Sequence, residues 1–140
     1  LQPAVAKRSS CGQHRYPGQD GLLRQLASIG YKSIELCSPA GYKEFASLGK
    51  MKPAELRKGI ETAGLRCESC HFGFREMKDK IDDSIAFAKE LGLKQMILAS
   101  FGLRRDAAIA DYKHAAGELN QAGEKVHKAG IQLGYHNHDN

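Results

Sequence analysis

The sequence predicts an α/β fold in which short parallel strands alternate with helices. In four places an amphipathic stretch ends in a glycine, and a short run of strand-forming residues follows at once. These runs begin at Gly30, Gly64, Gly92 and Gly130, at intervals of 34, 28 and 38 residues. Strands that alternate with helices pair in parallel, because parallel neighbours need a long connection and the helices must cover the sheet.

The four helices are predicted from the period of their apolar residues. Pro53 suits the first position of the second helix, and Asp20 and Asp106 are expected to cap the first and last helices. In each helix the apolar residues recur three or four positions apart, as on one face of a helix. The four sets are Leu22, Leu23, Leu26 and Ile29; Leu56, Ile60 and Ala63; Ile81, Ile85, Ala88 and Leu91; and Tyr112, Ala115, Leu119, Ala122 and Val126.

The four strands are expected within residues 30–37, 64–71, 92–99 and 130–137. Two architectures accommodate them: part of a (β/α)₈ barrel, which usually needs about 250 residues, or an open flavodoxin-like sheet, which is complete at this size. The chain ends directly after its last expected strand, with no helix to cover it, and this favours the partial barrel. We therefore expect an irregular segment over residues 1–18 and a half-barrel over residues 19–140.

Composition excludes several classes of protein. The chain has 140 residues, of which 41% are hydrophobic and 26% charged, as in ordinary globular domains. No apolar run approaches the roughly 20 residues that cross a bilayer, so no membrane partner is expected. The net charge is +5, but the basic residues are spread along the chain and form no run longer than two. This pattern is typical of solvated helix faces and does not favour a nucleic-acid partner.

Polar residues gather where the predicted strands end, which is where α/β folds bind ligands. Glu35 lies between apolar neighbours in its strand, where a carboxylate is costly unless it is paired or bound to metal. His71 lies two positions beyond the level of Glu35 when the strands are aligned on their glycines. The residues at or near the ends of the four expected strands are Glu35, Cys37 and Ser38; Ser69, His71 and Phe72; Ser100 and Phe101; and His136, Asn137, His138 and Asp139.

The segment Tyr135–Asp139 is the densest polar cluster in the sequence. Alternation along a strand means that either His136 and His138 or Tyr135 and Asn137 point toward the site. Two imidazoles two residues apart can share a divalent ion, so His136 and His138 are candidate metal ligands.

A Cys-x-x-Cys-His pattern, Cys67 to His71, also matches haem attachment and half of a zinc site. Neither a second Cys-x-x-Cys nor a helical context accompanies it, which disfavours both interpretations. We expect the four cysteines to be reduced or buried, since a chain of this length can bury its own core. Free cysteines favour a cytoplasmic location.

Four segments together resemble the sugar phosphate isomerase/epimerase family of xylose isomerase-like TIM barrels, which also includes apurinic-site endonucleases. The resemblance covers roughly residues 19–140 and corresponds to the N-terminal half of the barrel. The segments are Ile29–Leu36, Glu55–His71 with its Ser-Cys-His-Phe-Gly sequence, Ile81–Gly102 with Leu-Ala-Ser-Phe-Gly, and Gly134–Asp139 with Tyr-His-Asn-His.

The resemblance implies roles for individual residues. Glu35 and His71 match the catalytic positions that close the second and third barrel strands, and His136, Asn137 and His138 match a His-Asn-His segment at the fifth. Ser100 stands where the nuclease branch has a histidine, which argues against a nuclease. We expect Ser100, Asn137 and His136 to bind substrate.

The chemistry implied by the resemblance is metal-assisted proton transfer next to the carbonyl of a sugar or sugar phosphate, through an enediolate. Mn²⁺, Mg²⁺ or Zn²⁺ would polarise the substrate oxygens. The family's metal ligands lie on later strands, so the sequence leaves open whether this chain is active. The alternatives are a non-catalytic half-barrel that self-associates, and a hydrolase or lyase acting on sugars. We expect a homo-oligomer, because a half-barrel has two open strand edges.

Overall fold

The computed structural model describes residues 19–138 and confirms the α/β fold with parallel strands. All three neighbouring pairs of strands are parallel, and their order in the sheet is their order in the sequence. A flavodoxin-like sheet has a different order, so the sequential arrangement is that of consecutive barrel strands. The strands are β1 (Ser33–Cys37), β2 (Arg66–Phe72), β3 (Gln95–Leu98) and β4 (Gln132–Tyr135).

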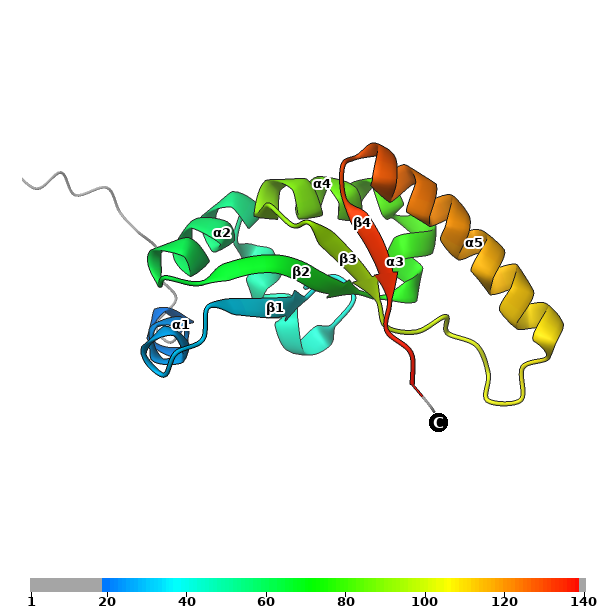
Figure 1. Cartoon of the computed structure of the whole chain (residues 1–140), viewed down its shortest axis with the longest axis horizontal. Helices are drawn as coiled ribbons and strands as arrows, with labels where there is room; N and C mark the ends of the chain where they lie inside the picture. The colour runs from blue at the N-terminus through cyan, green and yellow to red at the C-terminus, as the bar shows by residue number, and fades with distance from the viewer. Residues whose placement is uncertain (1–18, 139–140) are drawn as a thin grey trace, which may run out of the picture.

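The helices that connect the strands arch along one side of the sheet, while α1 lies near β1 at its edge (Figure 1). Two elements in these connections were not expected from the sequence: the 3₁₀ helix η1 after β1 and the short helix α3 after β2. No helix within residues 19–138 is long and apolar enough to cross a membrane. The helices are α1 (Gln19–Ser28), η1 (Lys43–Lys50), α2 (Pro53–Thr62), α3 (Phe74–Asp79), α4 (Ile81–Leu91) and α5 (Ile109–Lys128).

Glycine ends each helix that leads into a strand, as predicted. The φ angles of Gly30, Gly64, Gly92 and Gly130 are +105°, +85°, +81° and +81°. Residues with a Cβ rarely adopt this left-handed conformation, which turns the chain out of the helix. The spacing of these glycines therefore sets the length of each helix–strand unit.

The predicted helix starts are only partly correct. Pro53 begins α2 after Lys52, as expected. Asp20 lies inside α1 and does not precede it, since the helix begins at Gln19. Asp106 is also not a cap, because its carboxylate pairs with Arg104 at 2.9 Å. Helix α5 begins three residues later, where the Asp111 carboxylate accepts a hydrogen bond of 2.8 Å from the backbone N–H of Ala108.

The core lies between the sheet and its helices. On the sheet side, Cys70, Phe72, Met96 and Leu98 are each at most 1% exposed. The helix faces that cover them are the predicted ones, with two exceptions. In the first set, Leu23 and Leu26 pack against the core, but Leu22 and Ile29 are 58% and 72% exposed. In the last set, Tyr112 is 48% exposed. The other buried apolar residues are Leu48, Leu56, Ile60, Leu65, Met77, Ile81, Ala88, Leu91, Leu93, Ala115, Val126 and Ile131.

The opposite face of the sheet carries a different set of side chains. The strand registers align Glu35, Ser69, Gln95 and Gln132 in one row across the sheet. The row two positions further along contains Cys37, His71, Ile97 and Gly134. Because side chains alternate along a strand, these rows face away from the helix-covered core. In a closed barrel this face lines the interior.

We predict that Ile60→Ala lowers the free energy of unfolding by about 2–5 kcal/mol, because Ile60 is 1% exposed and its truncation leaves a cavity. The matched control is Ile29→Ala, which removes the same atoms from a side chain that is 72% exposed and should change stability by less than about 0.5 kcal/mol. Urea denaturation followed by circular dichroism measures both. Equal losses would contradict the placement of the core.

Candidate active site at the carboxyl ends of the strands

Polar side chains from three parts of the chain meet where the parallel strands end. Glu35 lies on β1, Ser69 and His71 lie on β2, and His136 directly follows β4. The register places Glu35 opposite Ser69, so His71 is two residues beyond the level of Glu35, as the glycine alignment predicts. The sheet thus brings together residues that are up to about a hundred positions apart in the sequence.

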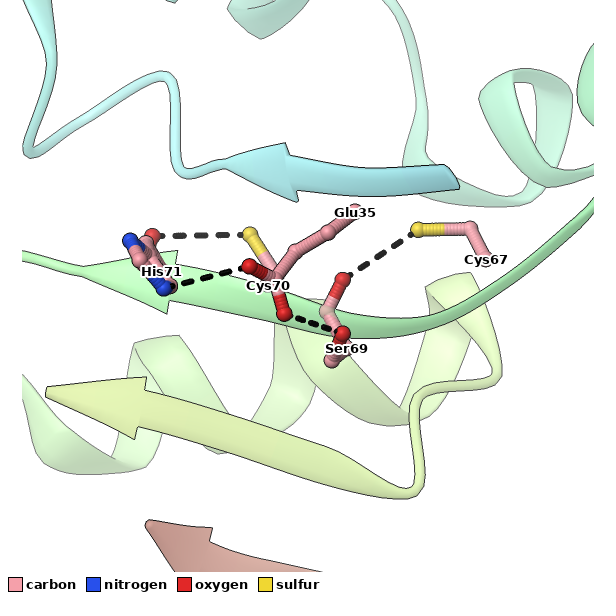
Figure 2. A network of polar contacts seen from close by, with 5 residues as sticks. All are labelled: Glu35, Cys67, Ser69, Cys70 and His71. Atoms are coloured by element: carbon pink, nitrogen blue, oxygen red, sulfur yellow. Dashed lines mark hydrogen bonds and ion pairs between the residues drawn. The ribbon is translucent and has the colours of Figure 1, made fainter. Parts of the chain in front are cut away.

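Glu35 is the centre of this group of residues. Its Oε1 lies 3.1 Å from Nε2 of His71, and its Oε2 accepts a hydrogen bond from the Ser69 hydroxyl. Figure 2 shows the carboxylate reaching from β1 to these two side chains on β2. Both carboxylate oxygens are therefore held, and the imidazole is held through one nitrogen.

The surroundings of Glu35 differ from those that the sequence suggests. Its side chain is 45% exposed, although both of its neighbours in the strand are apolar. Ile34 and Leu36 pack against the core, whereas Glu35 points to the opposite face. Its carboxylate is paired as expected, but the pairing is not imposed by burial.

The histidines continue the group toward β4. The rings of His71 and His136 are 5.2 Å apart in an edge-to-face arrangement, and those of His136 and His138 are 4.7 Å apart. Tyr135 stacks instead on Phe101 at 4.4 Å. Of the two alternatives that alternation left open, the structure therefore places His136 beside His71, with His138 next to His136.

Ser100 and Asn137 lie outside this contact network. The hydroxyl of Ser100 accepts a hydrogen bond of 3.0 Å from the backbone N–H of Gly102, which shapes the segment after β3. Asn137 is exposed. Within residues 19–138, neither side chain is hydrogen bonded to Glu35, His71 or His136.

Comparisons with known proteins place the chain in a family. A family model described as xylose isomerase-like TIM barrel matches residues 23–140. The chain belongs to this family. A comparison with curated proteins finds no match.

Several solved structures share the fold of this chain. A sugar phosphate isomerase/epimerase from Parabacteroides distasonis ATCC 8503 is 27% identical, with a TM-score of 0.73 over 88% of this chain and 46% of its own. An L-ribulose 3-epimerase is 23% identical, with a TM-score of 0.57 over 82% of this chain and 43% of its own. A xylose isomerase domain protein from Alicyclobacillus acidocaldarius is 13% identical, with a TM-score of 0.58 over 84% and 44%. The chain thus spans slightly less than half of the length of these relatives.

The described residues contain no complete metal site. Within residues 19–138 no group of three or more His, Cys, Asp or Glu side chains is placed to hold an ion. His136 and His138 have neighbouring rings, and imidazole is a ligand type that suits a divalent ion accepting nitrogen donors. The carboxylate of Glu35, which suits Mg²⁺ or Mn²⁺, is already engaged by Ser69 and His71.

The cysteines of the Cys-x-x-Cys pattern are not prepared for metal binding. Burial raises the pKa of the Cys67 thiol to about 11, and burial raises the pKa of the Cys70 thiol still further. Their Sγ atoms lie 3.4 Å from the carbonyl oxygen of Ser69 and 3.5 Å from that of His71, respectively. Since the thiolate is the metal-binding form, this environment favours a structural role for both residues. Cys37, Cys67 and Cys70 are free thiols.

Sequence reasoning missed one residue next to the site, Glu76 on α3. Its side chain is only 8% exposed, and it accepts hydrogen bonds from Ser38 after β1 and from the backbone of Gly73 after β2. Glu76 is the third residue of α3, and its bond to the backbone N–H of Gly73 is one half of a capping box. Gly73 has no side chain that could supply the other half. The sequence therefore carries no complete capping signature for α3, and Ser38, which directly follows β1, has no signature as the partner of Glu76.

The raised pKa of Cys67 predicts a loss of stability at alkaline pH. In the unfolded chain the thiol ionises near its ordinary value of 9.0, and in the folded chain near 11. The folded state thus binds the proton more tightly, so the stabilisation is complete below pH 9 and is lost as the pH rises toward 11.

Urea denaturation of the wild type and of Cys67→Ser, which does not titrate in this range, measures the effect. The difference in unfolding free energy between the two should be constant from pH 7 to pH 8.5 and should shift against the wild type between pH 9 and pH 11. A difference that stays constant up to pH 11 would contradict the burial of this thiol.

Proposed function

We propose that this chain supplies part of the active site of a sugar isomerase or epimerase, which moves a proton next to the carbonyl of a ketose or ketose phosphate. The observation that carries the proposal is the contact between Glu35 and His71, which lies on the uncovered face of the sheet toward the carboxyl ends of β1 and β2. Active sites of (β/α)₈ barrels lie at this end of the strands. Membership of the xylose isomerase-like family and the likeness to a sugar phosphate isomerase/epimerase support it.

Glu35 is suited to act as the base. Its carboxylate is 45% exposed on the site face and is oriented by Ser69. In the proposed reaction it accepts a proton from the carbon next to the carbonyl, and the electron pair of the broken C–H bond forms an enediolate. Return of a proton to the same carbon from the other face epimerises the sugar, and return to the neighbouring carbon isomerises it.

His71 is suited to support this transfer. Its Nε2 faces Glu35 at 3.1 Å, and its side chain is 19% exposed. An imidazole in this position holds the carboxylate in place and can exchange a proton with it. We further propose that His136, Ser100 and Asn137 bind the hydroxyl groups of the sugar.

A divalent ion, Mn²⁺, Mg²⁺ or Zn²⁺, would supply polarisation of the carbonyl when bound. His136 and His138 are the residues that would hold it in this half of the barrel. The remaining ligands would have to come from outside residues 19–138, since these contain no group of three suitable side chains. A cytoplasmic location, which the free thiols favour, is part of the same proposal.

A second candidate function is self-association without catalysis. The face of the sheet that carries Glu35 and His71 has no layer of helices against it, and β1 and β4 are edge strands within the described residues. Strand edges of this kind pair readily with another chain, and a homo-oligomer would cover them. Hydrolysis or elimination on a sugar is a third possibility on the same scaffold.

The test of the main proposal is exchange of the substrate's carbon-bound hydrogen with solvent. Ketoses and ketose phosphates are incubated with the protein and Mn²⁺ in D₂O, and deuterium incorporation is followed by NMR. We expect Glu35→Gln and His71→Asn to slow exchange by about 10²- to 10⁴-fold, the usual contribution of general acid–base groups. The matched controls Glu124→Gln and His127→Asn alter exposed residues of α5 and should leave the rate unchanged.

The other outcomes of this experiment would reject the assigned base or favour one of the other candidate functions. Exchange that is insensitive to Glu35→Gln would reject the assigned base. Cleavage products in place of exchange would favour the hydrolase or lyase. Absence of any reaction, together with a stable dimer in light scattering, would favour the self-associating half-barrel.

The two-imidazole arrangement predicts weak binding of Zn²⁺ and Mn²⁺. Isothermal titration calorimetry should detect binding to the wild type, and His136→Ala or His138→Ala should weaken it at least tenfold, since each removes one of two protein ligands. His127→Ala, on the exposed face of α5, is the matched control. Binding that survives in both site variants would exclude this pair as the ligands.

A further inference from the structure

A buried hydrogen-bond network joins the ends of β1 and β2. Its central residues are Ser38, which is 1% exposed, and Glu76, which is 8% exposed. The Ser38 hydroxyl donates to Oε1 of Glu76 and accepts a hydrogen bond of 2.9 Å from the backbone N–H of Gly41. Oε2 of Glu76 accepts a hydrogen bond of 2.7 Å from the backbone N–H of Gly73. One carboxylate therefore binds both the loop after β1 and the loop after β2.

The fit around this carboxylate is close. A Cβ atom on Gly41 would overlap with Oε2 of Glu76 and would lie 2.8 Å from the backbone nitrogen of Gly73. Only glycine lets the loop after β1 approach so closely. The two loops thus rest on each other through backbone and carboxylate atoms, with little space for movement.

The network is continuous with the proposed active site. The backbone N–H of Ser38 donates a hydrogen bond of 2.8 Å to the carbonyl oxygen of His71. Ser38 follows Glu35 by three residues, and Gly73 follows His71 by two. The strand ends that carry the Glu35–His71 pair are therefore held together directly beyond that pair.

The contact between Glu35 and His71 is too weak to fix the distance between these two side chains by itself. A contact between a carboxylate that is 45% exposed and an imidazole contributes little on its own, because water competes for both groups. Buried hydrogen bonds to a charged group are stronger and more directional. Holding the two backbones is therefore an effective way of fixing the distance between the two side chains.

We propose that Ser38 and Glu76 are positioning residues for the Glu35–His71 pair. A purely stabilising cap of α3 requires only the bond between Glu76 and Gly73. The bond to Ser38 connects a second strand and is not part of such a cap. The proposal rests on the proposed function only for the role of the pair, since its geometry can be measured without turnover.

The experiment is NMR spectroscopy of the whole chain with isotope-labelled histidine. We expect nuclear Overhauser contacts in the wild type between the His71 ring and the side chain of Glu35, and between the rings of His71 and His136. Ser38→Ala and Glu76→Ala should abolish both contacts. Glu76→Gln should retain them, because an amide oxygen can still accept from Gly73 and the Ser38 hydroxyl can accept from the amide NH₂.

The matched control for Ser38→Ala is Ser84→Ala, which removes a buried hydroxyl on α4 that is not part of the network. It should leave the signals of His71 unchanged. The exposed His114 and His127 of α5 serve as internal references in every spectrum.

Retention of both contacts in folded Ser38→Ala would overturn the proposal and leave the network with a stabilising role only. Should the alanine variants fail to fold, Glu76→Gln decides: loss of the contacts in this folded variant would show that the network does not position the pair in the manner described. Because no substrate is used, failure of the proposed enzymatic function would leave these results unaffected.

Discussion

The structure depends on parallel pairing of strands that all enter the sheet with the same orientation. Each strand is preceded by a helix that ends in a glycine, so each unit returns the chain to the same end of the sheet. Alternation along the strands then separates two faces. Apolar residues such as Leu36, Met96 and Leu98 contact the helices, and Glu35, Ser69 and His71 occupy the other face. Core and candidate site are therefore consequences of one pattern of pairing.

This separation explains how a charged group can lie in the middle of an apolar strand. Glu35 is flanked in the sequence by Ile34 and Leu36, yet it does not compete with them for the same environment. The core can be tightly packed while the site face remains polar. The buried carboxylate of Glu76 is the exception, and each of its oxygens accepts a hydrogen bond.

Comparison with xylose isomerase-like barrels indicates what the face of the sheet that carries Glu35 and His71 corresponds to. The chain spans 46% of the length of the sugar phosphate isomerase/epimerase that it resembles, and the two agree in fold over 88% of this chain. In a closed barrel the rows that contain Glu35 and His71 line the interior, where the other strands contribute further side chains. The proposed chemistry requires such a second set of residues for the metal.

Much of the fold could be predicted from the sequence because it is encoded locally. The glycine at the end of each helix, Pro53 at the start of α2 and the apolar period of the helices are short-range features, and they located the four strands. The prediction that Asp106 caps α5 was wrong, because a carboxylate before a helix can pair equally well with a neighbouring arginine, as Asp106 does with Arg104.

The sequence by itself also determined which residues stand at the strand ends, including Glu35, His71 and His136. Only the tertiary structure decided that His136 and not Tyr135 lies beside His71, and that Ser38 reaches Glu76. These choices depend on strand register and on loops packing against each other across the sheet. They are set by contacts between residues far apart in the chain, for which local patterns carry no signal.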